Sequence, residues 1–95
     1  MGSDAVMQHN GISLYMTCEC SPEQYDAMRY GVRVGYLRVR YGYFTVFCPD
    51  ANGDAVLSME IDGGGCFTDK ERDCCLSAAL HTIDRWVKDN NYDTY

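Results

Sequence analysis

Apolar and polar residues alternate along several stretches of this chain, which is the pattern of half-buried β-strands. The predicted strands cover residues 12–18, 32–41, 43–48 and 55–61. In the second of them the pattern slips by one residue beside Gly35, which predicts a β-bulge. The last two strands are predicted to form a hairpin, because Asn52-Gly53 between them supplies the positive φ that a tight turn requires.

Two capping signals predict two helices. Ser21-Pro22-Glu23-Gln24 offers an N-cap serine, a proline at the first helical position and a glutamine that closes a capping box, and Gly31 is placed to end this helix. Thr68-Asp69-Lys70-Glu71 is a second capping box, and it opens a longer helix with one apolar stripe. The predicted order β-α-β-β-β-α gives an α+β fold, in which an antiparallel sheet packs against two helices.

The whole chain, residues 1–95, is predicted to form a single domain, because a chain of this length has room for one core. Its hydrophobic content of 46% is that of a folded protein, and only residues 1–11 and 90–95 are expected to be loosely ordered. No stretch approaches the roughly 20 apolar residues of a membrane span, and no signal peptide is recognisable. We therefore expect a cytoplasmic protein, unless Met1-Gly2-Ser3 is a cloning remnant that replaced a signal peptide.

The six cysteines could form up to three disulfides in a secreted protein. The apolar segments suffice for a core without cross-links, however, and adjacent Cys74 and Cys75 would point to different faces of a helix. We therefore expect reduced thiols. Cys18 and Cys20 could bind zinc only if the fold brought other ligands to them, and their spacing matches no known zinc module. No metal site and no cofactor are predicted, and a zinc- or thiol-dependent small protein is kept as an alternative.

No group of residues has the arrangement that catalysis requires. Cys74 and His81 could act as nucleophile and base on the last helix, but seven helical residues place them about 10.5 Å apart, too far for a hydrogen bond. His9 has no acidic neighbour in the sequence and is predicted to be a surface histidine. The glycines before the last helix lack the Lys-Ser or Lys-Thr of a phosphate-binding loop. We therefore expect no catalytic residues and a protein that is not an enzyme.

Charge and composition point to two candidate binding surfaces. Fourteen acidic and eight basic residues give a formal charge of −6, which favours a basic partner over nucleic acid. The first surface consists of carboxylates near the two predicted helices, namely Glu19, Glu23, Asp26, Asp69, Asp73 and Asp84. The second surface combines arginines and tyrosines, which are common at interface hot spots and stack on nucleic-acid bases. Its residues are Arg33, Tyr36, Arg38, Arg40 and Tyr41, although the arginines could instead offset carboxylates such as Glu60 across the sheet.

Two resemblances follow from these features. From Pro22 onward, the predicted order α-β-β-β-α resembles that of double-stranded-RNA-binding domains, which implies RNA binding through the arginine and tyrosine strand. That family has a lysine cluster at the start of its last helix, where this chain has the mixed sequence Asp69-Lys70-Glu71-Arg72-Asp73. The chain is also similar in type to small acidic phage- or plasmid-encoded inhibitors of host defence, such as anti-CRISPR and anti-restriction proteins, in which carboxylates can replace nucleic-acid phosphates.

We therefore expect a non-enzymatic interaction protein that inhibits a nucleic-acid-handling complex by protein–protein binding and partial nucleic-acid mimicry. The expected partner is a basic nucleic-acid-binding protein or complex, with no direct role for nucleic acid or membrane. A homodimer through the tyrosine-rich strand is a further expectation. An RNA-binding module that uses the arginine and tyrosine strand is kept as an alternative.

Overall fold

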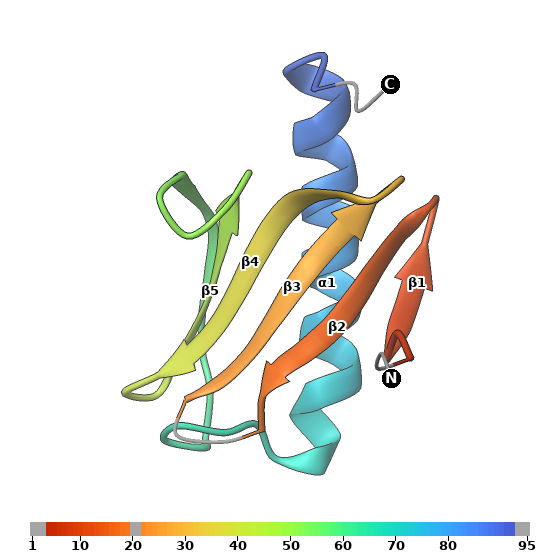
Figure 1. Ribbon diagram of the computed structural model, residues 1–95. Coiled ribbons are helices and arrows are strands. Elements are labelled where there is room, and N and C mark those ends of the chain that lie inside the picture. The colour runs from red at the N-terminus through yellow and green to blue at the C-terminus, as the bar shows by residue number, and fades with distance from the viewer. Residues whose placement is uncertain (1–3, 20–21, 93–95) are drawn as a thin grey trace.

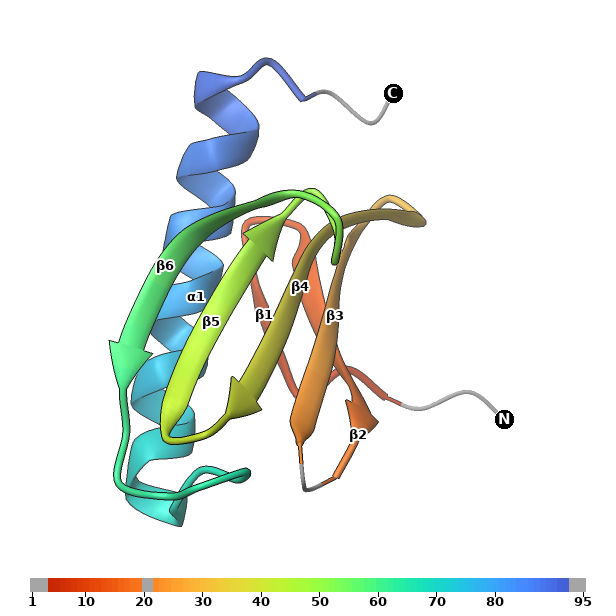
Figure 2. The ribbon, with the colours of Figure 1, turned by 90° about the vertical axis from the view of Figure 1, so that its left-hand side faces the viewer.

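The protein forms a six-stranded antiparallel sheet with one long helix against it, as seen in a computed structural model that describes residues 4–19 and 22–92 (Figure 1). The strands are β1 (Met7–His9), β2 (Ile12–Cys18), β3 (Glu23–Arg29), β4 (Val32–Arg40), β5 (Tyr43–Cys48) and β6 (Asp54–Glu60). They lie in the sheet in chain order, and α1 (Asp69–Asp89) follows them. Figure 2 shows the helix running along one side of the sheet. The α+β class and the antiparallel sheet are thus confirmed.

The predicted first helix, from Pro22 to Gly31, is wrong, because Glu23–Arg29 of this segment form strand β3. Its fully buried residues, Glu23, Tyr25 and Ala27, alternate with residues that keep some exposure, which is the period of a strand and not of a helix. The N-cap position of the predicted helix, Ser21, lies outside the described residues. The described chain contains one helix, so the order α-β-β-β-α, on which the resemblance to double-stranded-RNA-binding domains depends, is not present.

Three hairpin turns close on a pair of residues that both have positive φ. The pairs are Asn10-Gly11, Tyr30-Gly31 and Tyr41-Gly42. Two positive φ values match the turn to the right-handed twist of the flanking strands, and they require residues that tolerate the left-handed conformation. Gly31 therefore belongs to a hairpin turn between two strands and does not end a helix. The first of these turns also orders β1, a strand that the sequence pattern did not predict.

The hairpin of β5 and β6 is confirmed, although its turn closes differently from the prediction. Neither Asn52 nor Gly53 has positive φ. Instead, the Asp50 carboxylate accepts a hydrogen bond from the Asn52 backbone N–H at 2.9 Å, and the Asp50 carbonyl accepts one from Gly53 at 2.8 Å. Asp50 thus holds the turn through its side chain, which is a common role for aspartate.

Helix α1 begins as the sequence predicts. The Thr68 hydroxyl accepts a hydrogen bond from the Glu71 N–H, and the Glu71 carboxylate accepts one from the Thr68 N–H. These reciprocal bonds satisfy two of the backbone donors that a helix start leaves without intrahelical partners. The capping box is therefore confirmed.

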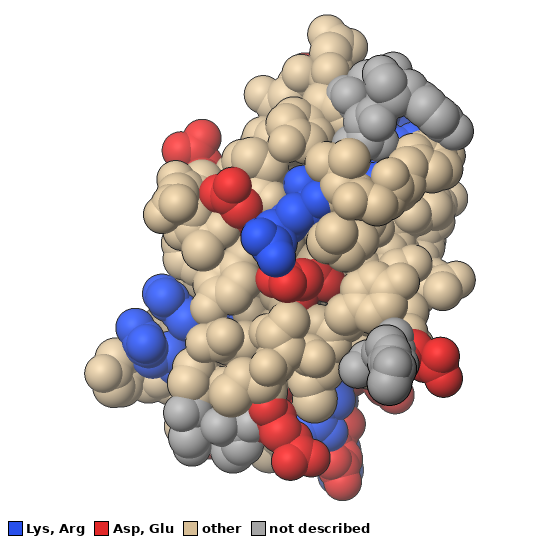
Figure 3. Space-filling view, in the orientation of Figure 1, with Lys and Arg blue, Asp and Glu red and all other residues tan. Residues whose placement is uncertain are grey.

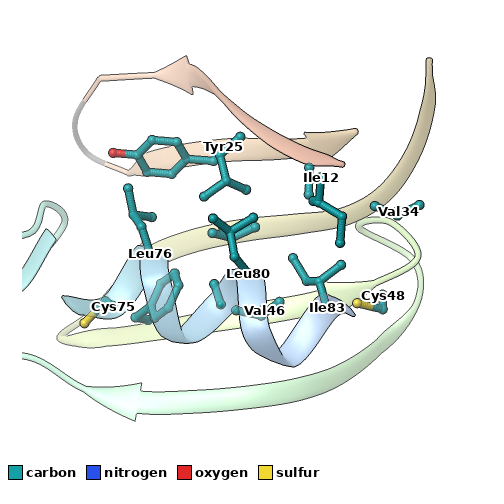
Figure 4. Packing of buried hydrophobic residues seen from close by; sticks show 14 of the residues in the cluster. Ile12, Tyr25, Val34, Val46, Cys48, Cys75, Leu76, Leu80 and Ile83 are labelled. Carbon is teal, nitrogen blue, oxygen red and sulfur yellow. The ribbon is translucent and has the colours of Figure 1, made fainter. Parts of the chain in front are cut away.

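The hydrophobic core lies between α1 and the sheet (Figure 4). Leu76, Leu80 and Ile83 of the helix point toward strand residues such as Tyr25 and Val46, and all five side chains are almost fully buried. Burial of such side chains is the main favourable term in folding. Because one helix supplies this cover, the sheet has one dry face and one face that no described element covers.

The bulge predicted beside Gly35 is confirmed, since the register of β3 and β4 shifts between Ala27 and Met28. Gly35 faces α1 closely. A Cβ atom at this position would lie 2.8 Å from Cδ1 of Ile83 and 3.3 Å from Cβ of Ala27. The glycine is therefore required by the close approach of the helix.

We expect Gly35→Ala to lower the free energy of unfolding by about 1–3 kcal/mol, because an added methyl group overpacks this contact. Ile83→Val removes Cδ1 and should relieve part of the clash. The double variant should therefore be more stable than the sum of the two single effects predicts, as measured by urea denaturation. Strictly additive effects would show that the helix does not approach the sheet this closely.

Candidate functional site

The uncovered face of the sheet carries a row of aromatic side chains. Direct pairing across β2, β3, β4 and β5 aligns Tyr15, Asp26, Tyr36 and Phe47. Met28 extends this group, because it lies two residues from Asp26 on the same face of β3. Figure 3 views this side of the molecule and shows a largely uncharged surface with a few arginines and carboxylates. We call this surface the open face.

Arginines of β4 line the open face beside these aromatic residues. Arg33 pairs with Asp26 at 2.9 Å between Nη2 and Oδ2. The Arg38 guanidinium lies over the Phe47 ring, 5.2 Å from its centroid. The register also places Arg40 on this face, beside Tyr43. The ion pairs found in the described part of the chain include neither Arg38 nor Arg40, so the expectation that carboxylates such as Glu60 offset the arginines is met only for Arg33.

The structure separates the carboxylates that the sequence grouped together. Glu23 is completely buried and not available to a partner, and Asp84 is only 8% exposed. Burial alone raises the pKa of Asp84, but hydrogen bonds from Lys88 and Asn10 outweigh it and hold this pKa below 3.8. The other carboxylates are at least partly accessible. Asp26 lies on the open face, whereas Glu19, Asp69 and Asp73 are exposed elsewhere.

Glu23 is the centre of a buried polar network that ties the start of β3 to the segment before α1. Its carboxylate accepts bonds from Nε and Nη2 of Arg72 at 2.9 and 3.2 Å, and from the Phe67 N–H at 3.0 Å. The Tyr25 hydroxyl donates to it as well. Burial raises the pKa of Glu23, but these donors outweigh burial and hold the pKa below 4.5. Because this carboxylate has no exposed surface, we interpret its ion pair with Arg72 as structural and not as part of a reactive site.

The cysteines depart from the expected reduced state at one position. Cys66 is disulfide-bonded, and the prediction for Cys20 falls outside the described residues. Four of the described cysteines carry reduced thiols, namely Cys18, Cys48, Cys74 and Cys75. Burial raises the pKa of Cys48 to about 12, so this thiol is unreactive near neutral pH.

The two histidines are brought together by the fold. His9 of β1 and His81 of α1 have ring centroids 4.2 Å apart, although sequence reasoning treated them separately. No group of three potential metal ligands occurs within residues 4–19 and 22–92. The two rings form one of the contacts between the edge strand β1 and the helix.

The surface has two notable hollows. One of about 440 Å³ lies at the end of β4 and is lined by Pro22, Val39, Arg40, Tyr41, Gly64 and Gly65. The other, of about 650 Å³, lies along α1 and is lined mainly by charged helix residues of both signs. The first adjoins the open face through Arg40, and we call it the Tyr41 hollow.

No protein-family model, curated protein or solved structure matches this chain. No helix in the described part of the chain has both the length and the apolar character needed to cross a membrane.

Proposed function

We propose that this protein is a non-enzymatic interaction protein that binds a partner protein through its open face. The composition of that face carries the proposal. Its centre holds Tyr15, Met28, Tyr36 and Phe47, and arginines of β4 lie beside them. Aromatic residues, methionine and arginine are enriched in protein interfaces, whereas the wet face of an antiparallel sheet is usually polar.

Charge on the open face indicates the kind of partner. Arg38 and Arg40 form no ion pair within the described residues, and Asp26 is neutralised by Arg33. The face therefore presents unpaired positive charge on a chain whose formal charge is −6. This arrangement suits a protein surface whose carboxylates surround an apolar centre. It suits nucleic acid less well, because phosphate binding grows with the number of cations and the chain is acidic as a whole.

We propose more specifically that binding of the partner inhibits a nucleic-acid-handling complex. Burial of Glu23 and Asp84 leaves fewer carboxylates to imitate phosphates, and Glu19, Asp69 and Asp73 are the exposed candidates that could do so. We therefore assign the main contact to the open face and not to the carboxylates. We therefore propose a partner with an acidic surface patch, whereas net charge alone favours a basic partner.

The test compares two open-face variants with a matched control. Tyr36→Ala removes a central aromatic ring, and Arg38→Glu reverses a charge at the margin. Arg85→Glu makes the same charge reversal on an exposed position of α1. Each tagged protein is used to capture partners from its natural source, and binding of any identified partner is then measured by calorimetry with purified proteins.

We expect wild type and Arg85→Glu to retain the same partner, and both open-face variants to bind it about tenfold or more weakly. Circular dichroism should show that all the variants fold, since neither open-face residue belongs to the core. Equal retention by every variant would contradict the proposal. So would a partner that is lost on nuclease treatment, because that result would indicate binding through nucleic acid.

A further inference from the structure

Tyr41 occupies a backbone conformation that is unfavourable for its side chain. Its φ is +54°, and its side chain is 85% exposed, so packing does not require a tyrosine here. Asparagine and glycine suit such a turn position better; the equivalent place is taken by Asn10 in the first hairpin and by Tyr30, which is less exposed, in the second. Residues in strained conformations cluster at functional sites, so the highly exposed Tyr41 is a candidate contact residue.

The surroundings of Tyr41 form a small hollow beside a cation. The Arg40 guanidinium lies over the Tyr41 ring, 5.7 Å from its centroid, and both residues line the Tyr41 hollow. Pro22 and Gly64 lie on other parts of its wall, and a Cβ atom at Gly64 would meet nothing within 4 Å. The hollow therefore combines an accessible apolar wall with one cation. Its volume of about 440 Å³ is within the range of ligand pockets.

We infer that the Tyr41 hollow is a subsite of the open face that takes an apolar side chain next to a carboxylate in a segment of the partner protein. The apolar side chain packs against Pro22 and the Tyr41 ring, and the carboxylate pairs with Arg40. This inference rests on the proposed function and adds the chemistry of the bound segment. Arginine suits this role, because its planar guanidinium can bind a carboxylate and stack on a ring at once.

The inference is tested with a defined probe, the peptide acetyl-Glu-Leu-Glu-Phe-Glu-amide, titrated into the ¹⁵N-labelled full chain. The control peptide has lysine at each glutamate position. We expect the acidic peptide at millimolar concentration to shift the amide signals of Val39, Gly64 and Gly65, and the lysine peptide not to shift them. An acidic peptide that leaves these signals unchanged, or a lysine peptide that shifts them equally, would overturn the inference.

Tyr41→Asn separates binding from folding. Asparagine tolerates positive φ, so the variant should melt at the same temperature as wild type or higher, while its affinity for the acidic peptide should fall about tenfold or more. Arg40→Gln should weaken peptide binding similarly without unfolding the chain. Unchanged affinity in Tyr41→Asn would overturn the inference.

Failure of the inference can be told apart from failure of the proposed function. If Tyr36→Ala loses the captured partner while Tyr41→Asn keeps it at full affinity, the open face is the interface and the hollow is not part of it. If the acidic peptide binds at the hollow but neither Tyr36→Ala nor Arg38→Glu affects capture, the hollow is a real site and the open-face function is wrong.

Discussion

Replacing Glu23 with alanine is expected to lower the free energy of unfolding by about 3–5 kcal/mol, because removing one member of a buried ion pair leaves its partners without compensation. The Arg72 guanidinium would lose both of its bonds to this carboxylate. The Tyr25 hydroxyl and the Phe67 N–H, which are buried, would lose their acceptor. An unsatisfied buried donor costs about 1–3 kcal/mol by itself.

Asp69→Ala is the matched control for this variant, since it removes the other carboxylate that pairs with Arg72. The Asp69 side chain is completely exposed, and exposed ion pairs contribute at most about 1 kcal/mol. Urea denaturation of both variants measures the difference. Similar losses for Glu23→Ala and Asp69→Ala would show that the network at Glu23 is not a principal support of the fold.

The pH dependence of stability tests whether the negative charge on Glu23 stabilises the folded chain. Its pKa in the folded chain is lowered from 4.5, so the stability that this carboxylate contributes is present above pH 4.5 and is lost as the pH falls through the lowered value. Glu23→Gln has no such proton to gain. Its stability should therefore fall less steeply than that of wild type in this acidic range.

The same residue explains why the sequence predicted a helix where the structure has a strand. Ser21, Pro22 and Gln24 carry a local helix signal, and the short alternation of Tyr25 and Ala27 was too brief to oppose it. Glu23 also interrupts the alternation of apolar and polar residues that indicates a strand, because it is a charged residue at a buried strand position. Its partner Arg72 lies 49 residues away, and a single sequence does not reveal such a pairing. The capping box at Thr68 was recognisable because all of its contacts are local.

The open face was predictable only in part, for a similar reason. Composition alone drew attention to Tyr36, Arg38 and Arg40, because they lie close together on one strand. Tyr15 and Phe47 belong to other strands, and they join the same surface through the register of the sheet. Register depends on which strands pair, and the incorrect first helix removed β3, the strand that connects β2 to β4.

Two adjacent residues of β5 should show how differently the two faces of the sheet contribute to stability. Phe44 points toward α1, is fully buried and packs edge-on against Phe67 with ring centroids 5.0 Å apart. Tyr43 lies on the open face and is 50% exposed. We expect Phe44→Ala to lower the free energy of unfolding by about 3–5 kcal/mol, through the lost burial and the cavity that remains.

Tyr43→Ala should cost about 1 kcal/mol or less, because its ring remains in contact with water in the folded chain. Thermal and urea denaturation of the two variants make the comparison within one strand. A small cost for Tyr43→Ala would mean that folding does not require this aromatic side chain of the open face, as the proposal of a docking surface expects. A cost as large as that of Phe44→Ala would mean that the open face supports the fold itself, and the argument for a docking surface would lose its basis.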